Sequence, residues 1–190
     1  MAAEITVRRI LKVNHAGEYG AIRIYGAQIR VARRLYPAIV AALSDIRAHE
    51  IEHCRLFHDA MSVRGARPCR VMSFWSLGGF VLGFVTALMG QRMIWICTEA
   101  VESAVHRHLD DQLAFLDGRD ADLKALIASI QGEELSHLHE AQARRGASGP
   151  VQAGAVVVIG ALTDLLIWLS TWGDSTRMAR EMRAAGSRRS

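Results

Sequence analysis

The residue types best suited to chemistry in this chain are glutamates and histidines at helical spacing. The stretch AHEIEHC contains His49, Glu50 and His53 in the order H-E-x-x-H. In zinc metallopeptidases the two histidines of this string lie one helical turn apart and bind the metal, and the glutamate is the base. One interpretation is therefore a zinc peptidase that depends on this segment alone.

A second E-x-x-H pair indicates a different site. In GEELSH, in the second half of the chain, Glu134 and His137 repeat the spacing of Glu50 and His53. His49, the first histidine of the zinc string, has no histidine counterpart in this second copy. The repeat therefore keeps E-x-x-H and discards H-x-x-x-H.

Two further glutamates follow the same period. Glu18, in HAGEYGA, precedes Glu50 by the same distance in sequence as Glu102, in CTEAVESA, precedes Glu134. A turn-forming stretch lies half way between the two glutamates in each case (35–37 and 117–120). If each half folds as an antiparallel helical hairpin, both of its glutamates lie about 24 Å from the turn, at about 1.5 Å per residue. They therefore meet at one level.

These acids lie within apolar helical stripes, so the folded chain would bury them. A buried carboxylate without a partner is costly, and such groups are paired or bind metal. Four glutamates neutralise two divalent ions, and one glutamate from each of two helices plus E-x-x-H from each of two others is the ligand set of di-iron and di-manganese bundles. The sequence predicts these six metal ligands: Glu18, Glu50, His53, Glu102, Glu134 and His137.

Three other side chains are candidates to orient these ligands, because metal-bound histidines usually need a hydrogen-bond partner. They are His15, Tyr25 and His108. We expect the other histidines, and the acids beside the ligands, to be solvated or ion-paired at the surface: His49, His58, His106, His139, Glu52 and Glu133.

Apolar periodicity and only three prolines predict an all-α fold. The expected helices cover residues 5–34, 37–63, 71–91, 93–116, 121–145 and 151–172. The first, second, fourth and fifth would form a ferritin-like four-helix bundle from two repeated hairpins, with two additional apolar, membrane-associated helices. We expect one domain over residues 1–172 and a basic, flexible tail over 173–190.

Composition narrows the class of partner. The 190-residue chain has a net charge of +4, and 51% of its residues are hydrophobic. No basic run with interleaved aromatic residues occurs, so we do not expect nucleic acid as a partner. The positive charge suits an anionic membrane surface instead.

Two segments are apolar enough to contact a membrane. Residues 73–90 are long enough to cross about 30 Å of hydrocarbon, whereas residues 156–169 are interrupted by Asp164. Either these helices are buried in the core, or, as we favour, they form an apolar mouth that dips into one leaflet. Headgroup contacts are then expected from four tryptophans and five arginines: Trp75, Trp95, Trp168, Trp172, Arg177, Arg180, Arg183, Arg188 and Arg189.

Four stretches together resemble the demethoxyubiquinone hydroxylase family of ubiquinone biosynthesis. They are VNHAGEYGAIRIYGAQ, HEIEH, CTEAVESAVHRHLDDQL and GEELSH, and they occur in the order that is typical of the family. The resemblance covers about residues 8–140. The chain departs from the family pattern at Ile22, Leu109 and Leu138.

The resemblance implies an activity, cofactors and a location. The six ligands above would hold two iron ions, and O₂ would hydroxylate the ring of a demethoxyubiquinol with electrons ultimately from NADH. The substrate would be a polyprenyl quinol. The enzyme would be peripheral on the cytoplasmic face of the bacterial inner membrane, or on the mitochondrial inner membrane in a eukaryote. A homo-oligomer or a partner protein of quinone biosynthesis is also expected.

Three alternatives remain open at this point. The first is another di-metal oxidase or an iron-handling protein on the same bundle. The second is the zinc peptidase, which predicts one zinc ion per chain and no dependence on Glu102. The third is a metal-free structural bundle in a membrane, which predicts that amide substitutions of Glu18 and Glu102 leave the fold intact.

Overall fold

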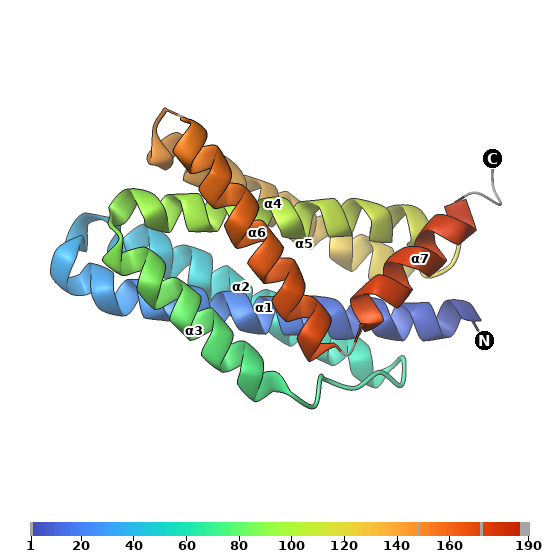
Figure 1. The fold of residues 1–190 in the computed structure, drawn as a ribbon. Coiled ribbons are helices and arrows are strands. Elements are labelled where there is room, and N and C mark those ends of the chain that lie inside the picture. The colour runs from blue at the N-terminus through green and yellow to red at the C-terminus, as the bar shows by residue number, and fades with distance from the viewer. Residues whose placement is uncertain (1, 148, 172, 187–190) are drawn as a thin grey trace.

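The computed structural model describes residues 2–147, 149–171 and 173–186, and almost all of these are helical (Figure 1). The six predicted helices are present and a seventh follows them. A short 3₁₀ turn (Pro37–Ile39) separates the first two. The α-helices are α1 (Ala2–Leu35), α2 (Val40–Ser62), α3 (Met72–Leu88), α4 (Gln91–Leu116), α5 (Ala121–Arg145), α6 (Pro150–Ser170) and α7 (Asp174–Gly186). The predicted all-α fold is confirmed.

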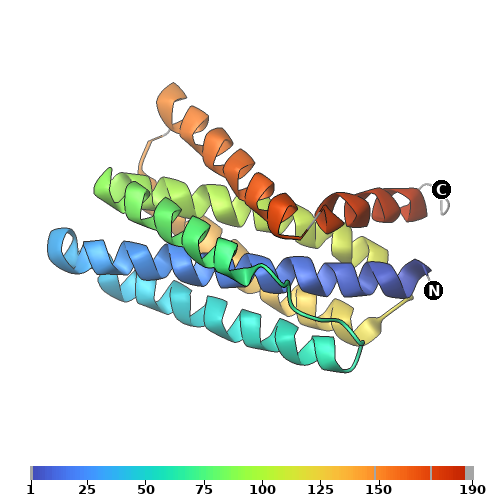
Figure 2. The ribbon, with the colours of Figure 1, turned by 60° about the horizontal axis from the view of Figure 1, so that its bottom comes forward.

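Helices α1, α2, α4 and α5 form a four-helix bundle from two hairpins, α1–α2 and α4–α5 (Figures 1 and 2). Pro37 begins the 3₁₀ turn of the first hairpin, as the fixed φ angle of proline favours. In the second turn Gly118 has a φ angle of 64°, which suits glycine. The Asp120 carboxylate accepts a hydrogen bond from the Leu123 amide at 3.0 Å and so caps α5.

Two of the three buried apolar clusters in the described residues lie within the bundle as layers, one toward each end. The layer nearer the N-terminus contains Leu11 of α1 and Phe57 of α2. The other layer contains Tyr25 of α1, Ile46 of α2 and Trp95 of α4. On α2, the segment between residues 46 and 57 therefore lies in the middle of the bundle, between the layers. This middle level is where the sequence predicts the metal ligands.

Helix α3 packs closely against α1 at two glycines. A side-chain carbon added at Gly79 would lie 2.6 Å from the Gly20 carbonyl oxygen, and one added at Gly83 would clash with the Ile24 carbonyl. Only glycine therefore allows this approach of the two backbones. The contact residues on α1 lie between Glu18 and Tyr25, so α3 lies against the part of α1 that carries the candidate ligand.

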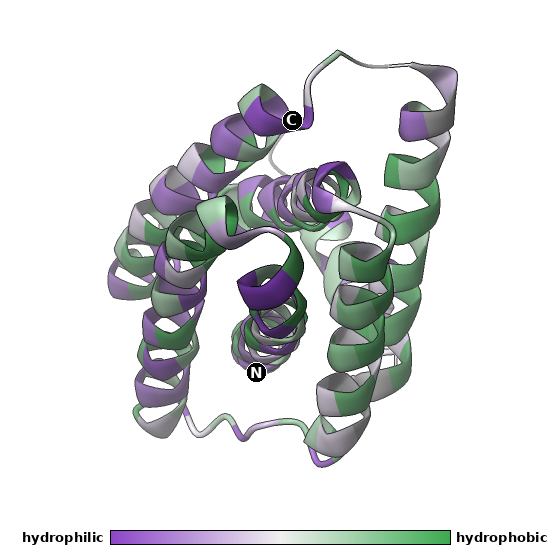
Figure 3. Ribbon diagram, turned by 90° about the vertical axis from the view of Figure 1, so that its left-hand side faces the viewer, coloured by the Kyte–Doolittle hydropathy of each residue, from purple (hydrophilic) through white to green (hydrophobic). Residues whose placement is uncertain are grey.

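Helices α3 and α6 leave most of their apolar side chains exposed. Figure 3 shows the hydrophobic colouring concentrated on these two helices, which lie on one side of the bundle. Exposed examples are Leu77 and Val85 of α3 and Val157 and Leu165 of α6. The alternative that α3 and α6 are buried core helices is therefore wrong for these faces.

The relative lengths of the two apolar segments differ from the prediction. Within the described residues, one segment is long and apolar enough to cross a membrane by length and composition alone, Gln152–Leu169 of α6. Helix α3 is shorter, because Gly90, with a φ angle of 116°, precedes the new helix α4. Helix α6 is continuous through Asp164, whose carboxylate lies at the surface, 3.3 Å from His108 Nε2.

The prediction that the tryptophans contact headgroups is wrong for Trp95 and stays a prediction for Trp168. Trp168 is 47% exposed on the apolar face of α6. Trp95 is fully buried in the core, where Arg144 lies over its ring, so it does not face a membrane. The side chain of Trp75, and Trp172, Arg188 and Arg189, lie outside the described residues.

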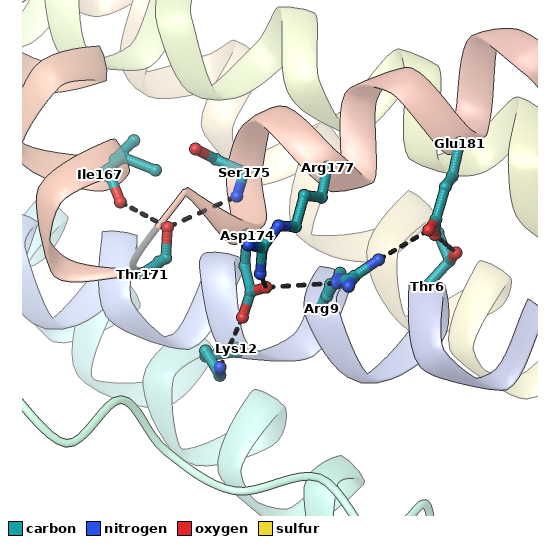
Figure 4. A network of polar contacts seen from close by, with 9 residues as sticks. All are labelled: Thr6, Arg9, Lys12, Ile167, Thr171, Asp174, Ser175, Arg177 and Glu181. Atoms are coloured by element: carbon teal, nitrogen blue, oxygen red, sulfur yellow. Dashed lines mark hydrogen bonds and ion pairs between the residues drawn. The ribbon is translucent and has the colours of Figure 1, made fainter. Parts of the chain in front are cut away.

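The prediction of a flexible tail from residue 173 is wrong for Asp174–Gly186, which form helix α7 against α1 and α4. Met178 and Met182, one turn apart, are buried in the core. Figure 4 shows ion pairs that join α7 to α1: Arg9 Nη1 lies 2.7 Å from Glu181, and Lys12 Nζ lies 2.6 Å from Asp174. The high arginine content of the segment concealed this stripe of methionines and acids.

We predict that Gly83→Ala destabilises the protein by about 2 kcal/mol or more, because the new methyl group forces α3 away from α1. Thermal unfolding measures this, and the midpoint should fall by roughly 4–8 °C. Gly160→Ala on α6 is the matched control, because an added carbon there meets open space. That change should be neutral or stabilising by up to about 1 kcal/mol. Equal midpoints for the two variants would contradict the close crossing.

Candidate metal centre

The structure brings the six predicted ligands together in the middle of the bundle. They fall into two overlapping groups, and within each group the ligand-type atoms lie within 4.8 Å of one another. Glu50 and Glu134, which are each only 1% exposed, belong to both groups. Glu18 and His53 complete one group, and Glu102 and His137 complete the other. All six side chains are buried.

The two groups are related by the repeat, and each E-x-x-H histidine faces the other hairpin. His53 Nδ1 of α2 lies 2.9 Å from Glu134 Oε1 of α5. His137 Nδ1 of α5 lies 3.6 Å from Glu50 Oε1 of α2. Two carboxylates are therefore shared between two outer pairs of ligand residues. This arrangement suits a pair of metal ions.

The donor atoms in this cluster fit a metal better than a hydrogen-bond network. Five buried atoms lack a well-aligned hydrogen-bond partner: Glu50 Oε1, His53 Nδ1, Glu134 Oε1, Glu134 Oε2 and His137 Nδ1. Buried polar atoms are nearly always satisfied, and these are the atoms that face one another across the site. Oxygen and nitrogen donors of this type suit iron or manganese.

Crowding of four carboxylates changes their protonation when no cation is bound. Burial, followed by the charge of Glu134, raises the pKa of Glu18 to about 7. The same two causes raise the pKa values of Glu50 and Glu102 well above the usual range. Burial acts against the charge of His53, but its contacts with Glu134 and Glu18 outweigh burial and raise its pKa to about 9. The metal-free site therefore holds protons that cations would displace.

Glu134 is the exception among the four acids. Burial raises the pKa of its carboxyl group, but the close Glu102, His137 and His53 side chains outweigh burial and hold that pKa well below the usual range. The Glu134 carboxylate is therefore ionised in the metal-free site, and its negative charge helps to keep the other three carboxyl groups protonated. Its shared position explains this, because both histidines and Glu102 converge on it.

Two residues that the sequence analysis assigned to the surface contact the outer nitrogens of the histidines. His53 Nε2 lies 3.1 Å from the Glu133 carboxylate, and His137 Nε2 lies 2.8 Å from His49 Nδ1. Both residues are exposed, as expected, but their contacts with the two ligand histidines were not predicted. The repeat contained the signal, since these residues occupy equivalent positions in its two copies, and each contacts the histidine of the other hairpin.

The three predicted orienting residues have different positions. The Tyr25 hydroxyl donates a short hydrogen bond to Glu102 Oε1, and the burial of this phenol raises its pKa, so that it stays protonated. The centre of the His15 ring instead lies 5.7 Å from the centre of the His58 ring. His108 pairs with Asp164 of α6. Of the three, Tyr25 alone makes a hydrogen bond or ion pair with a predicted ligand in the described structure.

Fold and site together define a class of protein. A four-helix bundle with four carboxylates and two histidines at its centre is the architecture of carboxylate-rich dimetal proteins. Comparison with known proteins identifies the family. Residues 5–170 match the family described as "Ubiquinone biosynthesis protein COQ7". The chain belongs to this family, which is the family that the sequence motifs resembled.

Relatives from distant organisms support the assignment. The chain is 38% identical to a 3-demethoxyubiquinol 3-hydroxylase of Rhodospirillum rubrum, over 86% of this chain and 77% of that one. It is 33% identical to a mitochondrial NADPH-dependent 3-demethoxyubiquinone 3-hydroxylase of Dictyostelium discoideum, over 87% and 76%. A human protein with the same description is 36% identical over 69% of this chain and 61% of that one.

We predict that the metal-free protein loses stability as pH rises from about 5 to 9. Glu18 and His53 have raised pKa values in the fold, so the folded state holds protons that the unfolded state releases. Their contribution is full below the unfolded pKa values and is lost as pH passes the folded ones. Glu18 alone accounts for about 2.5 kcal/mol over this range. Thermal unfolding in chelator should show a fall of at least roughly 5–10 °C, to which His53 adds.

Two controls accompany this measurement. Glu18→Gln should flatten the slope, because an amide does not titrate. Bound divalent metal should reverse it, because the ligands must lose their protons to bind. A metal-free protein that becomes more stable with rising pH would contradict the predicted shifts.

Proposed function

We propose that this chain is a di-iron monooxygenase that hydroxylates the ring of a demethoxyubiquinol in ubiquinone biosynthesis. Membership of the COQ7 family and the names of the relatives support a hydroxylase of this pathway. The observation that carries the metal assignment is the sharing of Glu50 and Glu134 between two buried ligand groups. An isolated mononuclear site has no use for a second histidine and a fourth carboxylate.

The chain's own residues have distinct roles in this proposal. The six residues would hold the two irons: Glu50 and Glu134 belong to both ligand groups, Glu18 and His53 would complete one group, and Glu102 and His137 would complete the other. Tyr25 holds Glu102 by its hydroxyl hydrogen bond. Each histidine uses Nδ1 toward the site, so its Nε2 is left to contact the other hairpin. With Nδ1 toward the metals, each of the two histidines would carry its proton on Nε2, which points away from them.

When bound, two ferrous ions supply the capacity to reduce O₂, so that one oxygen atom enters a ring C–H bond and the other leaves as water. The protein limits side reactions by excluding bulk water. Apolar layers above and below the ligands contain Leu11, Phe57, Ile46 and Trp95, all of which are fully buried or nearly so. Such walls also strengthen the electrostatic interactions inside the site.

The electron source is proposed only at the level of a reduced nicotinamide nucleotide. NADH is the donor that the sequence resemblance implies. The names of the Dictyostelium and human relatives specify NADPH instead. The hydroxylation consumes two electrons and two protons per O₂, so a donor of this class balances the reaction whichever nucleotide supplies it.

We propose that the exposed faces of α3 and α6 dip into one leaflet of the membrane that holds the quinone. Such a continuous apolar surface on one side of a protein marks an interaction site. A polyprenyl quinol would enter the bundle from that side. The cytoplasmic face of a bacterial inner membrane, or the mitochondrial inner membrane in a eukaryote, is the proposed location. A homo-oligomer or a partner protein of quinone biosynthesis stays a prediction.

The zinc peptidase interpretation is not favoured by the geometry. It needs His49 and His53 to bind one metal together. His49 Nδ1 instead lies against the Nε2 atom of His137, and His49 belongs to neither group of converging ligand atoms in the described residues. The histidine that does converge with His53 on Glu134 comes from the second half of the chain, as the repeat predicts.

Metal content per chain tests the proposed function. Protein purified without chelator from iron-supplied cells should contain about two irons. Glu134→Ala should lose both irons, because both groups share this residue, and Glu102→Ala should lose at least one. Glu140→Ala is the matched control on α5, because Glu140 pairs with Arg144 at the surface. The loaded protein should then hydroxylate a demethoxyubiquinol in the presence of O₂ and a reductant. One zinc ion, retained in Glu102→Ala, would instead favour the peptidase.

We also predict that His49 and Glu133 control how firmly each iron is held. Loss of a hydrogen-bond partner to a metal-bound histidine weakens binding about 10–100-fold. Glu133→Ala should therefore speed the loss of one iron to a chelator, and His49→Ala should speed the loss of the other. The rate of release is measured directly and needs no activity. Release at the wild-type rate in both variants, with Glu140→Ala as reference, would contradict this role.

A further inference from the structure

A groove lined by arginines runs along the outside of the bundle where α1, α2 and α3 meet. Two adjoining hollows of about 260 and 580 Å³ form it, and Arg23, Arg30 and Phe80 line both. Arg33 of α1 and Arg47 of α2 line the smaller hollow. We call this feature the arginine groove. None of the six predicted metal ligands lines it, so it is separate from the candidate metal centre.

The charge of the arginine groove is not balanced by the protein. No aspartate or glutamate lines either hollow, and none of its arginines makes an ion pair with a described residue. Their contacts are with neutral groups. Arg23 donates to the Tyr19 hydroxyl at 2.7 Å, Arg47 donates to the Ile22 carbonyl at 3.3 Å, and the Arg30 guanidinium lies 5.9 Å from the centre of the Phe80 ring.

Several other arginines of the chain pair with acids. Arg55 pairs with Glu52 and Asp59, and Arg64 pairs with Asp120. Four neighbouring guanidinium groups repel one another unless an anion lies between them. Guanidinium groups bind phosphate with two parallel hydrogen bonds each, so the complementary ligand is a phosphate.

The second wall of the arginine groove is apolar and identifies the kind of phosphate compound. Leu77, which is 64% exposed, and Phe80 line the larger hollow, and the Phe80 ring stacks on Phe84 further along α3. Ser73 and Ser76 add hydroxyl groups near the start of the helix. A soluble phosphate would leave this wall in water, whereas an acyl chain would cover it.

We propose that the arginine groove binds the phosphate of an anionic phospholipid whose acyl chains lie along α3. This inference rests on the proposed docking of α3 and α6 onto a membrane. The arginines would set the depth of α3 at the level of the headgroups, with Phe80 and Phe84 below them in the hydrocarbon. Because α3 crosses α1 beside Glu18, a fixed depth of α3 also fixes the height of the metal site above the membrane.

Vesicle binding of the metal-loaded full chain tests the proposal. We would compare neutral phosphatidylcholine vesicles with vesicles that contain phosphatidylglycerol. Binding to the anionic vesicles should be stronger, and Arg23→Gln with Arg30→Gln should lower it about tenfold or more, with little change on neutral vesicles. Arg8→Gln with Arg55→Gln removes the same net charge from exposed positions outside the groove. This control should lower binding only slightly.

A second variant separates the two proposals. Leu77→Ser with Phe84→Ser should weaken binding to both kinds of vesicle, because it removes apolar area from α3. If this variant binds both as the wild type does, the docking proposal is wrong. If it weakens binding but the groove variant behaves like its charge-matched control, docking stands and the arginine groove is not a lipid site. If inorganic phosphate or NADPH, at the same concentration as the anionic lipid, releases the protein from the vesicles, the proposal that a lipid occupies the groove is wrong.

Discussion

Mutual repulsion of four buried carboxylates is the constraint on which the rest of this structure depends. Glu18, Glu50, Glu102 and Glu134 lie at one level of a bundle whose other interior side chains are mostly apolar. Such a layer is stable only with bound cations or with protons on the acids. The raised pKa values of three of the four show the proton-bound alternative. The apolar layers above and below make this constraint strict, because they keep water away.

The helices outside the bundle follow from the same constraint. The four bundle helices turn their ligands and apolar layers inward, so the proposed lipid-soluble substrate would have to make its first contact at another surface. Helices α3 and α6 expose an apolar surface on one side that suits this role. Helix α7 covers the end of the bundle nearest the N-terminus, where Met178 and Met182 complete the apolar layer. The ion pairs of Arg9 and Lys12 with Asp174 hold it there.

Much of the fold and of the site follows from periodicity. The internal repeat predicts which glutamates and histidines meet, because equal distances from two turns bring side chains to one level. His49 and Glu133 were missed because contacts between hairpins depend on how two helices face each other, and α2 and α5 are far apart in sequence. Helix α7 was missed because two buried methionines among arginines give a weak signal. The arginine groove could not be predicted, because whether an arginine has an acidic partner depends on which helices pack beside it.

The crosswise contacts of the two hairpins carry a consequence for the origin of this protein. Each hairpin contains half of the ligands, yet His53 faces Glu134 and Glu133 of the second hairpin, and His137 faces Glu50 and His49 of the first. One hairpin alone therefore has no complete metal site. An ancestral chain of a single hairpin would have had to dimerise to bind two metals. Duplication and fusion would then have joined the two copies, and left positions 49 and 133 free to become histidine in one and glutamate in the other.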